Sequence, residues 1–248
     1  MFARRALLAA ALCWLTGASA LAAETKVAVA GNFTEPAREI AARFEAKTGH
    51  NVILSFGSSG QFYAQIANGA PFEVFLSADS ERPLRAEAEG LTVPGSRFTY
   101  ATGRLVLWSR TAGLVDSSGA VLAKGRFEKL AIADARAAPY GQAAVETLTR
   151  LKLYDAVKPK IVTGASITQT YQHVQTGAAE LGFVALSQVI NAPGGSRWIV
   201  PSHYHTPIEQ QAVLLKTGAR NEAARAFLQY LKGAEARAII KRYGYEIR

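Results

Sequence analysis

Sulfur-containing residues are almost absent from this sequence. One Cys and one Met occur among the 248 residues, and the Cys is Cys13. A single Cys cannot form an internal disulfide, and it cannot supply a Cys-based zinc or iron–sulfur site. A disulfide-stabilised fold and a protein with a Cys-based metal site are therefore excluded.

Charged residues are also sparse, at 19% of the chain, whereas hydrophobic residues make up 49%. A disordered chain shows the opposite balance, so this composition predicts a folded protein of one large or two small domains. The formal net charge is +9, but the basic residues form loose groups, such as those in 124–129, instead of a dense run with interleaved aromatics. We therefore expect a solvated surface and no nucleic-acid partner.

Long apolar runs are missing except at the start of the chain. Residues 1–23 contain Arg4 and Arg5, then an apolar stretch from Ala6 to Leu15, then small residues. This pattern is typical of a secretory signal peptide, and its apolar core is shorter than the ~20 residues that span a membrane. We expect export to the periplasm and removal of residues 1–23, which lowers the net charge from +9 to +7 because that segment holds two Arg and no acid.

Short apolar runs alternate with helical patterns over the rest of the chain. The patterns predict strands at 26–31, 51–56, 72–76, 98–108, 130–133, 160–162, 181–185 and 211–216. They predict helices at 34–47, 61–68, 81–89, 141–151, 168–176, 221–231 and 234–242, and a connecting loop at 191–207. Such alternation favours an α/β fold, with mainly parallel sheets flanked by helices.

Two α/β units in an exported chain predict two lobes. We expect residues 24–103 plus 205–248 to form lobe 1 and residues 104–204 to form lobe 2. The chain would cross between the lobes near 100–105 and return near 203–209, and the two C-terminal helices would pack on lobe 1.

Motifs of the common enzyme classes are absent. The sequence has no G-x-G-x-x-G, no Walker loop and no H-E-x-x-H. Ser59 lies at a strand-to-helix turn where a nucleophile could be displayed, but the turn is not G-x-S-x-G. His203, His205 and Glu209 could suggest a metal site, although an exposed hinge loop explains them better. We expect no catalytic residue, no protein ligand to a metal cation and no cofactor.

The informative feature is a set of four helix starts rich in small, hydroxyl or amide residues, at 31–34, 57–60, 138–141 and 164–168. The first N–H groups of a helix lack intrahelical partners and carry a partial positive charge. Helix starts aimed into one cleft make an anion site without Lys or Arg. Asn32, Ser59 and Tyr140 would add side-chain donors, although Asn and Ser at such turns are more often helix caps.

The segments that follow resemble one family, the periplasmic molybdate-binding proteins that serve as receptors of ABC transporters. They are VAVAGNF (27–33), SFGSSGQFYAQIANGAPFEVFLSAD (55–79), PGSRFTYATGRLVLWS (94–109), APYG (138–141), GAAELGFVAL (177–186) and QQAVLLK (210–216). The resemblance implies a two-lobed class II periplasmic binding fold that closes over molybdate or tungstate, as a monomer that delivers its ligand to a membrane permease.

The resemblance also implies which residues bind the anion. The family's first-turn Asn falls on Asn32, the second serine of its turn on Ser59, its second-lobe tyrosine on Tyr140 and a backbone donor on Ile167. The neighbouring Gly31 and Ser58 complete the predicted set. Gly31 stands where some relatives have Thr, and Ala185 where others have Tyr, so both of those contacts are missing here.

Two alternatives stay open from the sequence. One is a receptor of the same fold for sulfate or another oxyanion, because the radius of the cage decides among such anions. The other is an exported hydrolase that uses Ser59 as its nucleophile.

Overall fold

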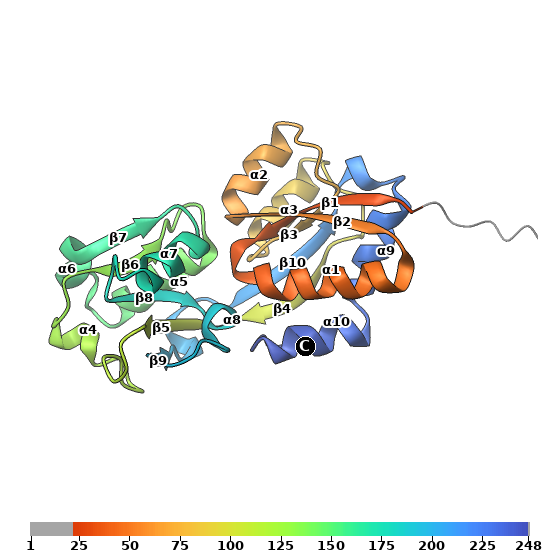
Figure 1. Cartoon of the computed structure of the whole chain (residues 1–248). Helices are drawn as coiled ribbons and strands as arrows, with labels where there is room; N and C mark the ends of the chain where they lie inside the picture. The colour runs from red at the N-terminus through yellow and green to blue at the C-terminus, as the bar shows by residue number, and fades with distance from the viewer. Residues whose placement is uncertain (1–21, 248) are drawn as a thin grey trace, which may run out of the picture.

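The computed structural model describes residues 22–247. It contains two five-stranded sheets, each flanked by helices, which form two lobes lying side by side (Figure 1). The predicted two-lobed α/β fold is confirmed. The predicted signal peptide lies outside the described residues apart from its last two positions. Within the described part of the chain, no helix has both the length and the apolar character needed to cross a bilayer.

Lobe 1 is built on the sheet order β2-β1-β3-β10-β4. Its strands are β1 (Glu24–Ala30), β2 (Asn51–Gly57), β3 (Val74–Leu76), β4 (Phe98–Gly103) and β10 (Ile208–Leu214). Its helices are α1 (Thr34–Thr48), α2 (Ser59–Ala67), α3 (Glu81–Ala88), α9 (Glu222–Leu231) and α10 (Ala234–Arg242), with short 3-10 turns at Gly31–Phe33 and Lys216–Gly218.

Lobe 2 is built on the sheet order β7-β6-β8-β5-β9. Its strands are β5 (Leu105–Ser109), β6 (Leu130–Ala133), β7 (Ile161–Gly164), β8 (Leu181–Ala185) and β9 (Ser196–Ile199). Its helices are α4 (Val121–Lys124), α5 (Pro139–Arg150), α6 (Tyr154–Val157), α7 (Ile167–Gln175) and α8 (Leu186–Val189), with 3-10 turns at Lys158–Lys160 and Ser202–Tyr204.

Each sheet combines parallel and antiparallel pairs. In lobe 1, β1 pairs in parallel with β2 and β3, whereas β10 pairs antiparallel with β3 and β4. In lobe 2, β6 pairs in parallel with β7 and β8, and β5 pairs antiparallel with β8 and β9. The antiparallel pair β4–β10 arises because the chain leaves lobe 1 along β4 and returns to it along β10.

The two crossings between lobes differ in length, with one residue between β4 and β5 and eight residues, 200–207, between β9 and β10. The apolar run expected as one strand over 98–108 is interrupted at Arg104, and β4 and β5 join different sheets. The region expected as a loop over 191–207 contains β9, whose Trp198 is buried against lobe 2. That part of the prediction was wrong, because a four-residue edge strand among Pro, Gly and Ser residues has too few alternating positions to reveal its period.

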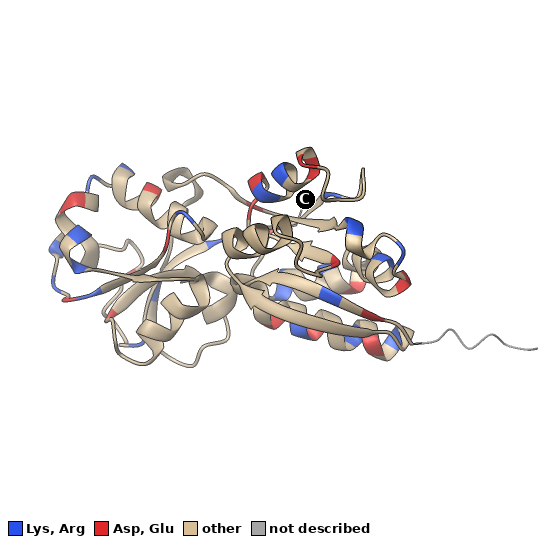
Figure 2. Ribbon diagram, turned by 90° about the horizontal axis from the view of Figure 1, so that it is seen from above, with Lys and Arg blue, Asp and Glu red and all other residues tan. Residues whose placement is uncertain are grey.

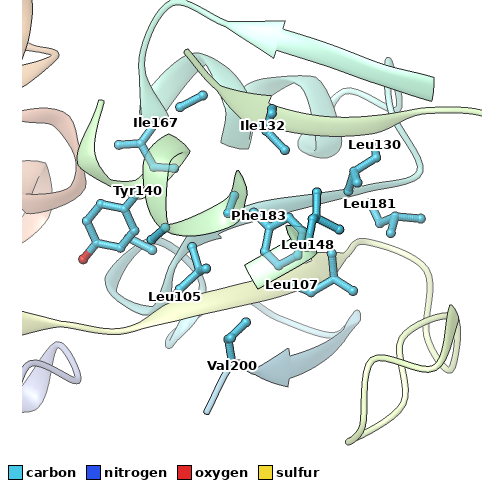
Figure 3. Packing of buried hydrophobic residues seen from close by; sticks show 14 of the residues in the cluster. Leu105, Leu107, Leu130, Ile132, Tyr140, Leu148, Ile167, Leu181, Phe183 and Val200 are labelled. Carbon is cyan, nitrogen blue, oxygen red and sulfur yellow. The ribbon is translucent and has the colours of Figure 1, made fainter. Parts of the chain in front are cut away.

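Both faces of each sheet are buried, as the continuous apolar strands predict. In lobe 1, Val27 and Leu76 face α1, α9 and α10, which contribute Phe44, Phe227 and Ile240. Phe75 and Val213 face the opposite way and pack with Phe62 of α2. In lobe 2, Leu107 and Phe183 pack with Leu148 of α5, as Figure 3 shows. The charged residues are spread over the outer helices of both lobes (Figure 2).

Candidate functional site

All six residues predicted to bind an anion line one small cavity between the lobes. The cavity is small, with a volume of about 10 Å³. Its lining comprises Ala30, Gly31, Asn32, Gly57, Ser58, Ser59, Ala78, Ala138, Pro139, Tyr140 and Ile167, all of which are uncharged. Strands β1 and β2 from lobe 1, and β6 and β7 from lobe 2, end beside it, which is the usual position of ligand sites in α/β folds.

Three helices begin at the cavity, and residues in their first turns help to determine where each helix starts. Helix α2 begins at Ser59, α5 at Pro139 and α7 at Ile167, each one or two residues before the predicted start. Pro139 suits the first turn of α5, because its ring fixes φ and its missing N–H would have had no helical partner. The first turns of α2 from lobe 1 and of α5 and α7 from lobe 2 all line the cavity, and the first turn of a helix carries N–H groups without helical partners and a partial positive charge.

Ser58 and Ser59 make different hydrogen bonds at the start of α2. The Ser58 hydroxyl accepts a hydrogen bond from the Gln61 N–H at 3.3 Å, and the Gln61 side chain accepts one from the Ser58 N–H at 3.3 Å, forming a capping box. The Ser59 hydroxyl instead accepts a hydrogen bond from the Ala78 N–H at 2.9 Å. Because that bond uses a lone pair of Ser59, the hydroxyl proton remains for an acceptor in the cavity.

Asn32 is not a helix cap. No side-chain cap is formed at the start of α1 or of the preceding 3-10 turn. The Asn32 amide nitrogen donates to the Gln210 side-chain oxygen at 2.8 Å and to the Tyr245 hydroxyl at 3.0 Å. The capping interpretation therefore holds for Ser58 and not for Asn32.

Tyr140 reaches from lobe 2 into lobe 1. Figure 3 shows its ring beside Ile167 at one end of the lobe 2 core, with the hydroxyl pointing away from that core. The hydroxyl accepts a hydrogen bond from the Gln210 side-chain nitrogen at 3.2 Å. The ring therefore lines the cavity, while the hydroxyl joins a polar cluster behind it. Burial raises the pKa of Tyr140 well above its ordinary value, so the hydroxyl keeps its proton at neutral pH.

Gly31 and Ile167 face each other across the gap between lobes. A Cβ placed on Gly31 would lie 2.4 Å from the Thr168 hydroxyl oxygen and 3.6 Å from Ile167. A glycine at position 31 therefore lets the start of α7 approach the start of the lobe 1 turn. Thr168 lies at the position that a hydroxyl-bearing residue 31 would occupy, and sequence analysis did not identify it.

His203 and His205, which the sequence offered for a metal site, and Ala185 do not line the cavity. His203 is exposed with its ring 4.2 Å from that of Tyr204, and His205 places Nδ1 2.8 Å from the Thr206 carbonyl oxygen. In residues 22–247, no group of three or more His, Cys, Asp or Glu could hold a metal ion. Ala185 is buried at the end of β8, where its N–H donates to the Gln188 side chain at 3.0 Å.

Hydrogen bonds across the gap hold the two lobes together around the cavity. The Gly60 N–H donates to the Ala137 carbonyl at 2.9 Å. The Ser187 hydroxyl of α8 donates to the Asn32 carbonyl at 2.7 Å. At the rim, Arg82 forms an ion pair with Asp79 and donates to the Arg136 carbonyl at 2.8 Å. These contacts describe a closed arrangement of the lobes.

Sequence analysis missed the polar cluster behind Asn32, which we call the inner network. It comprises Gln210 of β10, Tyr100 of β4, and Tyr245, which follows α10. All three are buried. The pair of glutamines at the start of the predicted strand 211–216 was the available signal, but the pattern could not show whether Gln210 or Gln211 contacts Asn32. Burial raises the pKa of Tyr245 to about 12, and that of Tyr100 well above its ordinary value.

Comparisons with known proteins agree with this geometry. Residues 25–246 match the family described as bacterial extracellular solute-binding protein. The chain is 58% identical to the molybdate-binding protein ModA of Rhodobacter capsulatus, covering 91% of this chain and 89% of that one. It is 57% identical to the protein of the same name from Azotobacter vinelandii, covering 93% of each.

Solved structures give the same result. The periplasmic molybdate-binding protein of Azotobacter vinelandii superposes with a TM-score of 0.88 at 46% identity, covering 90% of this chain and 99% of that one. The sulfate-binding protein SubI of Mycobacterium tuberculosis superposes with a TM-score of 0.76 at 13% identity, covering 90% and 86%, which shows a shared fold only. The chain therefore belongs to the family of bacterial extracellular solute-binding proteins, in the same group as the molybdate-binding proteins.

Proposed function

We propose that this protein is the periplasmic receptor that captures molybdate, and also tungstate, between its two lobes and delivers it to the permease of an ABC transporter. The observation that carries the proposal is the cavity lined by uncharged residues and by helix starts from both lobes. As a transport receptor the protein needs no catalytic group, so Ser59 acts as a binding residue and not as a nucleophile.

The chemistry of the lining suits a fully deprotonated dianion. Backbone N–H groups, hydroxyls and an amide can donate to every oxygen of a tetrahedral anion without burying a formal counter-charge. A carboxylate in the lining would instead accept a proton from a protonated anion, and the residues around this cavity include none. Sulfate has the same charge and shape as molybdate and is smaller, so the radius of the closed cage must separate the two.

Titration calorimetry with molybdate, tungstate, sulfate and phosphate tests the proposal. Molybdate and tungstate should bind with closely similar affinities, and sulfate and phosphate at least about a hundredfold more weakly, a difference of about 2.8 kcal/mol. Tighter binding of sulfate than of molybdate would assign the protein to the alternative class of receptor. Hydrolysis of ester substrates that disappears in Ser59→Ala would contradict the proposal.

The proposal extends to location and assembly. The mature protein works in the periplasm as a monomer, because one chain supplies both lobes and all the residues around the cavity. Its N-terminus should lie at or near Ala23 or Glu24, which the mass of the protein recovered from the periplasm would show.

A further inference from the structure

The inner network holds Asn32 from behind the cavity. The Gln210 side-chain oxygen accepts hydrogen bonds from the Asn32 amide nitrogen at 2.8 Å and from the Tyr100 hydroxyl at 3.0 Å. Its nitrogen donates to the Tyr140 hydroxyl at 3.2 Å. The pairing of β10 with β4 shifts register between Gln210 and Gln211, because Gln210 pairs with Ala101 and Gln211 with Thr99, which leaves Tyr100 as the extra residue of a bulge in β4. Gln210 thus has every polar atom engaged although it is fully buried.

The Asn32 amide is satisfied on one side only. Its nitrogen has two partners in the inner network, whereas its oxygen is buried with no hydrogen-bond partner among residues 22–247. Native proteins rarely leave a buried polar atom unpaired, and such an atom calls for an explanation. An oxyanion offers only acceptors, so it would be repelled by the amide oxygen and would be bound by the amide nitrogen.

We propose that Gln210 and Tyr245 are positioning residues that set the orientation of the Asn32 amide, and that the oxyanion is bound when this amide is turned to present its nitrogen to the cavity. The inference rests on the proposed function of the cavity. According to this inference, Gln210 and Tyr245 affect the affinity for the oxyanion although neither residue lines the cavity.

The inner network accommodates the turned amide without losing partners. The nitrogen and oxygen of a side-chain amide have nearly the same shape, so a half-turn of both amides needs no extra space. The Gln210 nitrogen then donates to the Asn32 oxygen, and the Tyr140 hydroxyl donates to the Gln210 oxygen. Tyr100 accepts from Gln210 and donates to the Ser77 carbonyl, which lies 3.3 Å from its hydroxyl.

Tyr245 keeps a partner in both orientations. Its hydroxyl lies 2.7 Å from the Asn32 carbonyl oxygen and 3.0 Å from the Ser187 hydroxyl. With the amide turned, Tyr245 donates to the Asn32 side-chain oxygen, and Ser187 alone serves the Asn32 carbonyl. With an oxyanion bound, no polar atom of Asn32 is left unpaired, so the ligand completes the network.

The test measures molybdate affinity in Gln210→Met and Tyr245→Phe, with Gln211→Met as the matched control. Gln211 is the next residue of β10, and its side chain bonds to Arg97 at 2.8 Å and to Thr99 at 3.2 Å, away from the cavity. Each inner-network variant should weaken binding about tenfold, the effect of one orienting hydrogen bond. The control should bind as the wild type does. Tyr245→Phe keeps its ring, which packs 5.4 Å from that of Phe33, so it remains informative if Gln210→Met does not fold.

A second readout separates positioning from a purely structural role. In protein labelled with ¹⁵N-asparagine, the side-chain NH₂ signal of Asn32, assigned by its loss in Asn32→Ala, should shift on saturation with molybdate. The shift should persist in Gln211→Met and shrink in Tyr245→Phe. Wild-type affinity in both inner-network variants, or an unmoved Asn32 signal in wild-type protein that binds molybdate, would overturn the inference alone. Wild-type protein that binds no tetrahedral oxyanion would overturn the proposed function and the inference with it.

Discussion

Ser59 and Asn32 each make a contact inside lobe 1 in addition to the expected contact with the anion. The Ser59 hydroxyl accepts from the buried Ala78 N–H, and the Asn32 amide donates into the inner network. A substitution at either position therefore affects stability and affinity through different atoms, and the two effects can be measured separately.

Ser59→Ala and Asn32→Ala should each weaken molybdate binding by roughly ten- to a hundredfold, because a hydrogen bond to a charged group is worth about 1.5–3 kcal/mol. Ser59→Ala should also lower the free energy of unfolding by about 1–3 kcal/mol, since the Ala78 N–H loses its acceptor. Calorimetry and thermal melts on the same samples test both effects. Ser202→Ala, in an exposed 3-10 turn, is the control. Unchanged affinity in both site variants would contradict the neutral donor cage.

Thr168 of lobe 2 lies so close to Gly31 that a side chain at position 31 would collide with its hydroxyl. In Gly31→Ala the new Cβ would meet the Thr168 hydroxyl at 2.4 Å, so the lobes could not close fully around the ligand. Overpacking of this kind costs about 1–3 kcal/mol, which predicts roughly a five- to hundredfold loss of affinity. Calorimetry on Gly31→Ala with and without Thr168→Ala tests this interpretation. Adding Thr168→Ala should restore most of the loss, whereas an equal loss in both backgrounds would show that Thr168 is not the obstacle.

At the scale of elements, the end of β4 is one of the places where the two lobes approach each other closely. A Cβ on Gly103 would lie 2.1 Å from the Tyr140 hydroxyl and 2.6 Å from the Gln210 nitrogen. Tyr140 belongs to α5 of lobe 2, and Gln210 to β10 of lobe 1. The end of this strand therefore leaves space for a side chain from the other lobe.

Gly103→Ala should disfavour the closed arrangement and weaken molybdate binding by about 1–3 kcal/mol. In the Tyr140→Phe background the nearest tyrosine atom is the ring carbon, at 3.0 Å, so the added penalty should be smaller. Calorimetry gives the two penalties, and small-angle scattering shows whether the radius of gyration still falls on addition of ligand. Penalties of equal size in the two backgrounds would mean that Gln210, whose nitrogen would lie 2.6 Å from the new Cβ, and not the Tyr140 hydroxyl, is the obstacle.

For the whole molecule, the buried tyrosines link stability to pH. Burial raises the pKa of Tyr245 from 10.0 to about 12, and those of Tyr100 and Tyr140 rise well above 10.0 for the same reason. A raised pKa means that the folded state holds its protons more tightly than the unfolded state does. The resulting stability is fully present below about pH 10 and is lost as the pH rises toward 12.

Urea unfolding at several values between pH 7 and pH 11 should therefore show a free energy that is steady to about pH 9 and then falls. Tyr245→Phe should reduce the part of the fall that belongs to this residue, which reaches about 1.4 kcal/mol at pH 11. The control Ser202→Ala, in an exposed 3-10 turn, removes no titrating group and should leave the alkaline slope unchanged. An identical slope in Tyr245→Phe and wild type would contradict the raised pKa.

Local features of the sequence sufficed to predict most of the longer helices and strands, and they indicated Asn32, Ser59 and Tyr140 as candidate donors. The helix starts at 57–60 and 138–141 are marked by residues that act within three or four positions, such as the capping pair of Ser58 and Gln61. Hydrophobic period and length then predicted an α/β fold with two lobes, and the resemblance predicted the oxyanion between them and added Ile167, Gly31 and Ser58 to the site. Such signals are readable because each depends on neighbours in the chain.

Only the tertiary structure decided what stands behind the site. Asn32 contacts Gln210 and Tyr245, which lie 178 and 213 positions away along the chain. The register of β10 determines which of two adjacent glutamines contacts Asn32, and a shift of one residue would have exchanged them. The fit of Thr168 over Gly31 and of Tyr140 against Gly103 likewise depends on how closely two separately folded sheets approach. Distances between distant segments follow from packing of the whole molecule, so no local pattern could predict them.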